Sequence, residues 1–169
     1  MSIIPDYIWS KPDSVLATDA CLDGAGGVFW PRREYYHFSF PRAFKCQEHH
    51  INVLELVGLV VSIKLWGSYL KGQRVLLHCD NESTVTVVNS GRCKDALMLA
   101  WLRELSFELA CSQCIIKCSH VRGQDNRLPD LLSRWDSSPL APDTFRSLAP
   151  GEWKEVEVPA PMLTLRDLW

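Results

Sequence analysis

The alternation of apolar and polar residues predicts three short strands near the start of the chain. Residues 14–18 form a β-prone run, and the glycines of segment 24–27 mark a turn into a second strand over 27–30, which Pro31 ends. Residues 34–40 alternate aromatic with polar side chains, as a half-exposed strand does. Because the connections are short, we expect an antiparallel meander.

A long helix and a second group of elements follow this meander. From about His49 to Leu70 there is no proline and apolar residues cover almost the whole circumference, which indicates a largely buried helix that stops at Gly72. A strand–helix–strand connection is right-handed and makes its two strands parallel. The remaining expected elements are a strand over 74–79, helices over 82–89 and 95–110, a strand over 114–121 and a helix over 127–135.

The resulting order, βββαβααβα, predicts one α/β domain over residues 1–135. A chain of 169 residues, of which 47% are hydrophobic, is long enough for one packed core and a modest tail. Residues 136–169 contain five prolines and are expected to form a Pro-rich tail or interdomain linker.

Charge and cysteine content narrow the class of protein. The formal net charge of −2 gives no general attraction to polyanions, so a nucleic acid would have to be bound locally or through metal ions. The first residues lack a positively charged segment with a long apolar core, and no charge-free apolar run reaches membrane-spanning length. Seven scattered cysteines suit a reducing compartment. We therefore expect an intracellular protein, in the cytoplasm or nucleus, with no membrane partner.

Four acidic residues stand where an unpaired charge is costly. Asp19 closes the first strand and Asp80 closes the fourth, so a parallel pairing brings them to one sheet edge. Glu55 lies in an apolar helix with no Lys or Arg one turn away, and Asp130 lies among leucines. Hard divalent ions such as Mg²⁺ take carboxylate ligands, and two of them together promote phosphodiester hydrolysis. The four acids are therefore candidate metal ligands and catalytic residues.

Each acid also has a simpler structural interpretation. Asp19 is a possible turn residue before a glycine-rich loop, and Asp80 a possible N-cap of the next helix. Glu55 is a possible buried acid held by hydrogen bonds, and Asp130 a first-turn acid favoured by the helix dipole. One shared site explains all four better than four coincidences.

A zinc site is a competing metal hypothesis. Its candidate ligands are Cys111, Cys114, Cys118 and His120. The three thiols would straddle a helix end and a strand instead of converging on one point, so the sequence disfavours this site.

Four blocks of the sequence resemble the ribonuclease H domains of retroelements. They read ATDA at 17–20, LEL at 54–56, CDN at 79–81 and GQDNRLPDLLSR at 123–134. The last block is similar to gypsy-like elements and, with the Asp80-Asn81 pair, to tyrosine-recombinase retrotransposons of the DIRS and Ngaro type. The resemblance covers about residues 14–135.

The resemblance implies an RNase H-like fold, with a five-stranded mixed sheet in the order 3-2-1-4-5 and helices on both faces. It implies two Mg²⁺ ions, with Mn²⁺ as a substitute, on Asp19, Glu55, Asp80 and Asp130. It also implies cleavage of the RNA strand of an RNA/DNA hybrid to 5′-phosphate and 3′-hydroxyl ends. A reverse transcriptase domain, and a recombinase domain, of the same polyprotein are the implied partners.

Candidate substrate contacts flank the four acids. Hybrid is distinguished from DNA by groove width and 2′-hydroxyls, and the residues expected near the RNA sugars are Cys21, Asp23, Asn81 and Glu82. The candidates for phosphate contact are Arg122, Gln124, Asn126 and Arg127. The chain departs from the family in two respects. Only residues 91–94 stand where many members carry a basic insertion, and Gln124 stands where many carry a mobile histidine.

Other functions fit the sequence less well. An integrase-type enzyme would need a glutamate where Ile115 stands, and a proofreading exonuclease would need one at Cys21. The main alternative is a catalytically weak or silent RNase H-like module that serves as a spacer or docking unit in a retroelement polyprotein.

Overall fold

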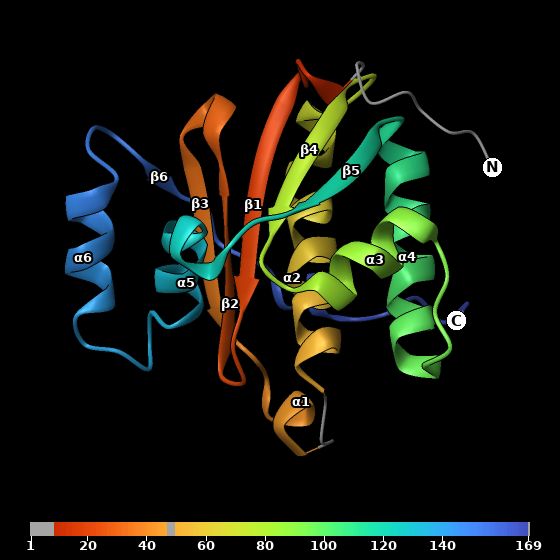
Figure 1. The fold of residues 1–169 in the computed structure, drawn as a ribbon. Helices are drawn as coiled ribbons and strands as arrows, with labels where there is room; N and C mark the ends of the chain where they lie inside the picture. The colour runs from red at the N-terminus through yellow and green to blue at the C-terminus, as the bar shows by residue number, and fades with distance from the viewer. Residues whose placement is uncertain (1–8, 47–49, 169) are drawn as a thin grey trace.

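The computed structural model describes residues 9–46 and 50–168, which form a mixed sheet with helices on both faces (Figure 1). The sheet has six strands in the order β5-β4-β1-β2-β3-β6. β2 is antiparallel to both β1 and β3, and β4 is parallel to both β1 and β5. The strands are β1 Ser14–Ala20, β2 Gly24–Phe29, β3 Glu34–Ser39, β4 Arg74–Cys79, β5 Ile115–His120 and β6 Lys154–Glu155.

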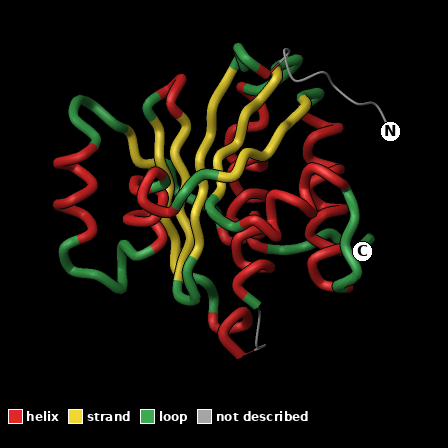
Figure 2. The backbone as a smooth tube through the Cα atoms, viewed as in Figure 1, coloured by secondary structure: helices red, strands yellow, loops and turns green. Residues whose placement is uncertain are grey.

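The described residues form six α-helices, of which α2 and α4 lie on one face of the sheet and α5 and α6 on the other (Figures 1 and 2). They are α1 Arg42–Cys46, α2 Ile51–Trp66, α3 Glu82–Ser90, α4 Ala96–Ser112, α5 Arg127–Ser133 and α6 Ala141–Leu148. Short 3₁₀ turns connect them: η2 Trp30–Arg32, η3 Gly67–Tyr69, η4 Gly123–Asp125 and η5 Ala160–Leu163. The expected fold class and the order of the first five strands are confirmed, and the four expected helices are present. The described residues contain one strand, β6, and two helices, α1 and α6, more than expected.

Helix α2 is the central helix of the main core. Twelve of its sixteen residues are buried, which agrees with the all-round apolar pattern. The helix begins at Ile51 and ends at Trp66 with a 3₁₀ turn after it, while the expected start at His49 lies outside the described residues. Segment Ile51–Tyr69 is long and apolar enough to cross a membrane, but 72% of that window is buried inside the domain. A core helix satisfies the same test, so this segment is weak evidence for a membrane span.

The glycine-rich segment is a strand, where a turn was expected. The hairpin closes earlier, where Cys21 N donates to Gly24 O at 2.8 Å, and β2 already begins at Gly24. A Cβ on Gly26 would collide with the side chain of Leu132, and one on Gly24 would lie 2.8 Å from the carbonyl oxygen of Ser133. The missing side chains therefore let α5 lie directly on β2.

The segment after residue 135, expected to be a tail or linker, packs on the domain. Phe145 of α6 is 2% exposed, β6 pairs with β3, and Leu163 joins the main core. Two prolines that suggested a linker stand in the first turns of α6 and η5, where a missing N–H costs nothing. A role of 136–169 in connecting a further domain stays a prediction.

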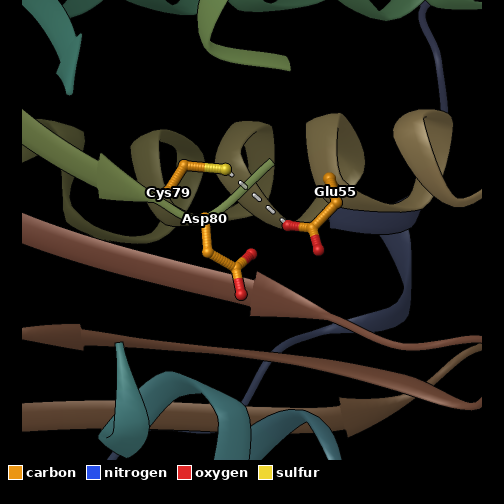
Figure 3. Close-up of side chains that lie close together, drawn as sticks. All are labelled: Glu55, Cys79 and Asp80. Atoms are coloured by element: carbon orange, nitrogen blue, oxygen red, sulfur yellow. Dashed lines mark hydrogen bonds between the residues drawn. The ribbon is translucent and has the colours of Figure 1, made fainter. Parts of the chain in front are cut away.

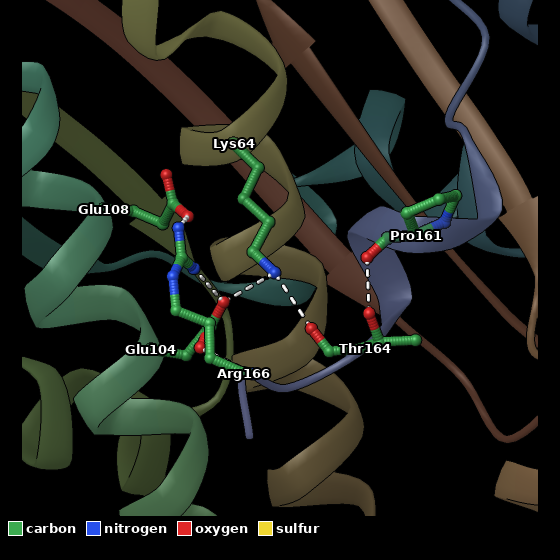
Figure 4. A network of polar contacts seen from close by, with 6 residues as sticks. All are labelled: Lys64, Glu104, Glu108, Pro161, Thr164 and Arg166. Carbon is green, nitrogen blue, oxygen red and sulfur yellow. Dashed lines mark hydrogen bonds and ion pairs between the residues drawn. The ribbon is translucent and has the colours of Figure 1, made fainter. Parts of the chain in front are cut away.

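A buried ion-pair network anchors the end of this segment (Figure 4). Glu104 of α4 is fully buried and pairs with Lys64 Nζ at 2.8 Å and with Arg166 Nη1 at 2.6 Å. Arg166 also pairs with Glu108 at 2.7 Å, and Lys64 donates to Thr164 O at 3.0 Å. Because a buried carboxylate without a partner is costly, the pairing of Glu104 fixes the segment on α2 and α4.

Gly26→Ala should destabilise the protein by about 1 to 3 kcal/mol, because the new methyl group overlaps Leu132 and pushes α5 away from β2. Urea unfolding measures the loss. Gly58→Ala is the matched control, because a Cβ there lies 3.4 Å or more from its neighbours and alanine favours the helix. Equal stability of the two variants would show that α5 does not depend on the close approach.

Candidate active site

Asp19 lies on β1 and faces helix α5. It pairs with Gly26 in the sheet and is 5% exposed, so the turn interpretation of this residue is wrong. Its Oδ2 accepts a hydrogen bond from Ser133 Oγ at 2.7 Å, and the same hydroxyl lies 2.8 Å from the carbonyl oxygen of Asp130. Ser133 thus ties β1 to the helix that carries Asp130.

Glu55 reaches the same place from the opposite face of the sheet. It is 3% exposed on α2, and its Oε1 accepts from Ala20 N at 3.2 Å. The thiol of Cys79 lies 3.8 Å from its Oε2, and Asp80 points into the same space (Figure 3). Ligand atoms of Glu55, Cys79 and Asp80 all lie within 4.8 Å of one another. Two hydrogen-bond donors, one of them a weak thiol, do not offset the free-energy cost of burying the ionised carboxylate of Glu55.

Asp80 follows β4 and is half-buried. The N-cap of α3 is Asn81, whose Oδ1 accepts from Thr84 N at 2.9 Å, so the capping interpretation of Asp80 is wrong. A Cβ on Gly123 would lie 3.4 Å from Asp80 Oδ2, which shows how closely the loop before α5 approaches this carboxylate.

Asp130 does stand in the first turn of α5, as its structural interpretation expected. Its Oδ1 also accepts from Arg134 Nε at 2.8 Å, and the two side chains are 38% and 54% exposed. An exposed i,i+4 pair of this kind is weak, so Asp130 can exchange Arg134 for another cation at little cost.

The two buried acids, Asp19 and Glu55, have raised pKa values. Burial, then the charges of Asp19, Cys79 and Asp80, raise the pKa of Glu55 to about 10. Burial also raises the pKa of Asp19 to about 7, against the hydrogen bond from Ser133 and with added repulsion from Asp80 and Asp130. Asp80 and Asp130 therefore contribute to the electrostatic environment of the two buried acids, and Arg134 brings positive charge to Asp130.

Divalent cations fit this donor set. Oxygen-rich carboxylate clusters suit hard ions such as Mg²⁺ and Mn²⁺. The compact group contains Cys79 where the sequence predicted Asp19, but contact with Cys118 and burial raise the pKa of the Cys79 thiol. A protonated thiol is a poor ligand for a hard cation. The ligand set that best fits the chemistry is therefore the four acids, with Cys79 as a neighbour of Glu55.

The expected zinc ligands do not converge. Cys111 is exposed on α4, Cys114 and Cys118 are buried, and His120 ends β5 with its Nε2 3.1 Å from Asp80 O. Within residues 9–46 and 50–168, the single group of three potential ligands is the one around Glu55.

The residues expected near the RNA sugars surround the acids. Cys21 is half-exposed and donates from Sγ to Ser133 O at 3.2 Å, while Asp23 and Glu82 are exposed. Both polar atoms of the Asn81 side chain form hydrogen bonds within the protein. Its Oδ1 caps α3, and its Nδ2 donates to Asn52 Oδ1 at 2.8 Å.

Three of the four expected phosphate contacts are exposed, namely Arg122, Gln124 and Arg127. Asn126 is different, because it is 2% exposed and its Nδ2 donates to Thr18 O at 2.9 Å. It stands at the N-cap position of α5 without a side-chain capping bond. The side chain of Asn126 therefore joins the loop to β1 and is too buried to contact a phosphate.

Sequence reasoning missed Ser133 and Arg134 as partners of the acids. Both lie one helical turn after Asp130, and this spacing was the available signal.

Comparison with known proteins identifies the fold. No family model matches the chain, and no curated protein matches it. Solved structures do match, and they define the ribonuclease H-like fold. RNase H1 from the halophilic archaeon Halobacterium salinarum NRC-1 is 12% identical, with a TM-score of 0.57 over 78% of this chain and 98% of that one.

Two further neighbours were solved with nucleic acid. LC11-RNase H1 in complex with RNA/DNA hybrid is 15% identical, with a TM-score of 0.57 over 71% of this chain and 93% of that one. The foamy viral protease-reverse transcriptase in complex with RNA/DNA hybrid is 15% identical, with a TM-score of 0.51 over 81% of this chain and 21% of that one. At such identities the likeness establishes the fold.

Without divalent metal, the protein should lose stability as pH rises. A carboxyl whose pKa is higher in the folded state holds its proton more tightly there, so folding is favoured at low pH and weakened as the group ionises. The loss should begin near the ordinary values of 3.8 and 4.5, continue to about 7 for Asp19 and extend toward about 10 for Glu55. We expect a fall on the order of 2 to 4 kcal/mol.

Urea unfolding in EDTA from about pH 5 to about pH 9 measures this fall. Glu55→Gln should flatten the profile, whereas Asp143→Asn, a change at an 84% exposed side chain, should not. A flat wild-type profile would mean that the acids do not repel one another.

Proposed function

We propose that this chain is a divalent-metal-dependent ribonuclease H that hydrolyses the RNA strand of RNA/DNA hybrids during reverse transcription and leaves 5′-phosphate and 3′-hydroxyl ends. The observation that carries the proposal is the burial of Asp19 and Glu55, whose pKa values are raised, from opposite faces of the sheet and beside Asp80 and Asp130. Within the described residues, neither Asp19 nor Glu55 forms an ion pair. Such a cluster is costly unless it binds positive charge.

In this proposal Asp19, Glu55, Asp80 and Asp130 hold two Mg²⁺ ions, for which Mn²⁺ can substitute. When bound, the ions supply the charge that activates a water and stabilises the leaving oxygen. Ser133 orients the carboxylate of Asp19, and Ala20 N orients that of Glu55. Asp130 is the adjustable member, because its pair with Arg134 is exposed.

Substrate selection is proposed to come from the residues around the acids. In this proposal Cys21, Asp23, Asn81 and Glu82 contact the RNA sugars, where a 2′-hydroxyl distinguishes RNA from DNA. Gln124, exposed in the loop before α5, neither gives nor takes a proton near neutral pH as a histidine does. We therefore expect slow turnover.

The cellular setting is proposed from the sequence resemblance and from one structural neighbour. We propose that the chain works beside a reverse transcriptase domain of a retroelement polyprotein, of the DIRS or Ngaro type and with a recombinase domain, in the cytoplasm or nucleus. The neighbour that supports this setting is a protease-reverse transcriptase with the same fold in part of its chain.

The purified protein with Mg²⁺ should cut RNA in a hybrid and leave double-stranded DNA and double-stranded RNA nearly intact, because only hybrid combines a 2′-hydroxyl strand with the intermediate groove. A gel assay with three end-labelled duplexes of one sequence measures this. Equal cutting of all three would reject the assignment. Failure to cut any of them would favour the silent docking module.

Asp80→Asn should abolish cleavage by removing a metal ligand, yet leave the metal-free protein at least as stable as wild type by removing one repulsive charge. Mg²⁺ at about ten to a hundred times its dissociation constant should stabilise wild type by roughly 1 to 3 kcal/mol, and the variant by less. Thermal melts with and without Mg²⁺ measure both effects, with Asp143→Asn as control. A variant that still cleaves, or that melts markedly lower without metal, would show that Asp80 is structural.

A further inference from the structure

A second concave surface lies at the other end of β3, where the segment after residue 135 returns to the sheet. It is an open pocket of about 760 Å³ between η2, α6 and β6. Basic and aromatic side chains dominate its lining: Arg32, Arg33, Tyr35, Arg146, Trp153 and Lys154. We call it the basic pocket.

The walls of the basic pocket belong to packed elements. Phe145 of α6 and Ala149, which follows this helix, are buried in a cluster with Leu132 of α5, and the ring of Phe145 lies 4.7 Å from that of Tyr35. On the other side, Lys154 N donates to Arg33 O at 2.9 Å. The backbone of Arg33 adopts a left-handed conformation, with φ of 51°, which is uncommon for a residue other than glycine. The backbones that carry the cations are therefore fixed by the fold.

The charges of the basic pocket are incompletely neutralised. Arg32 pairs with Glu34 at 3.0 Å, and Arg146 pairs with Asp143, whose side chain is 84% exposed. Arg33 and Lys154 form no ion pair within the described part of the chain. Glu152 is the one acid in the lining. A backbone hydrogen bond thus joins the two segments that carry these unpaired cations, and an anion bound there would add the charge that they lack.

We propose that the basic pocket binds the phosphate backbone of the RNA/DNA hybrid at a distance from the cleaved bond. The proposal rests on the proposed function for the identity of the nucleic acid. It also offers a source of affinity that the short connection at 91–94 does not supply, because the cations come from η2 and from the segment after residue 135.

The strand pairing gives the distance between the basic pocket and the acids. Asp19 pairs with Gly26, which pairs with His37, so Arg33 lies two strands across and four residues along from Asp19. Strand spacing and rise put their backbones on the order of 15 to 20 Å apart. Phosphates of one strand advance about 3.4 Å per base pair, so the basic pocket should meet the backbone roughly five base pairs from the cleaved bond.

The first test measures binding of a labelled hybrid in EDTA, where no cleavage occurs. Replacing both unpaired cations, Arg33→Gln with Lys154→Gln, should weaken binding roughly 5- to 20-fold at low salt and reduce the slope against salt by about 2. The control replaces two exposed cations elsewhere, Lys71→Gln with Arg103→Gln, and should bind as wild type does. Wild-type affinity and slope in the Arg33 and Lys154 variant would overturn the proposal.

The second test uses the wild-type protein, so it does not depend on a variant that folds. Hybrids carry neutral methylphosphonate linkages roughly five base pairs from the cleavage site, on one side or on the other. Substitution on one side should weaken binding as the double variant does, and the double variant should then show no further loss. Equal binding to all these hybrids would overturn the proposal. A protein that binds in this pattern and cuts no hybrid would keep the basic pocket and reject the proposed function.

Discussion

The repulsion between buried carboxylates is the constraint around which this domain is organised. Asp19 and Glu55 approach the end of β1 from opposite faces of the sheet, and both are almost completely excluded from water. The neighbouring contacts change the free-energy cost of burying these two charges. The Ser133 hydroxyl and the Ala20 amide limit it, while Asp80 and Asp130 add charge. This penalty lowers the stability of the metal-free fold, and a bound cation would relieve it.

The sequence was sufficient to predict the parts of the fold that depend on periodic patterns. The all-round apolar run of α2, the compact β4 and the short connections of β1 to β3 each follow from local physics, and they lead to the observed strand order. The four acids were also recognisable, since Glu55 has no local cation. Their meeting at one site is a property of the topology, because parallel β1 and β4 end at the same sheet edge.

The features that the sequence did not predict depend on contacts between residues far apart in the chain. The glycines of β2 look like a turn until α5 is placed on them, and Asn126 is a candidate phosphate contact until Thr18 is placed beside it. Prolines after residue 135 looked like a linker, but two of them begin helical turns whose apolar residues reach the core. The contact of Cys79 with Glu55 depends on side-chain packing between β4 and α2, for which no periodic pattern gives a signal.

The anchor of Arg166 on Glu104 has a consequence for the order in which the domain matures during synthesis. Strands β1 to β5 leave the ribosome before β6, η5 and Arg166 do. Until then Glu104 has Lys64 as its cation, and the free edge of β3 lacks the two residues of β6. An exposed strand edge is a site for mispairing with another chain. The nascent domain therefore passes through a stage that is folded around its acids but open at one edge, and emergence of the last segment closes it.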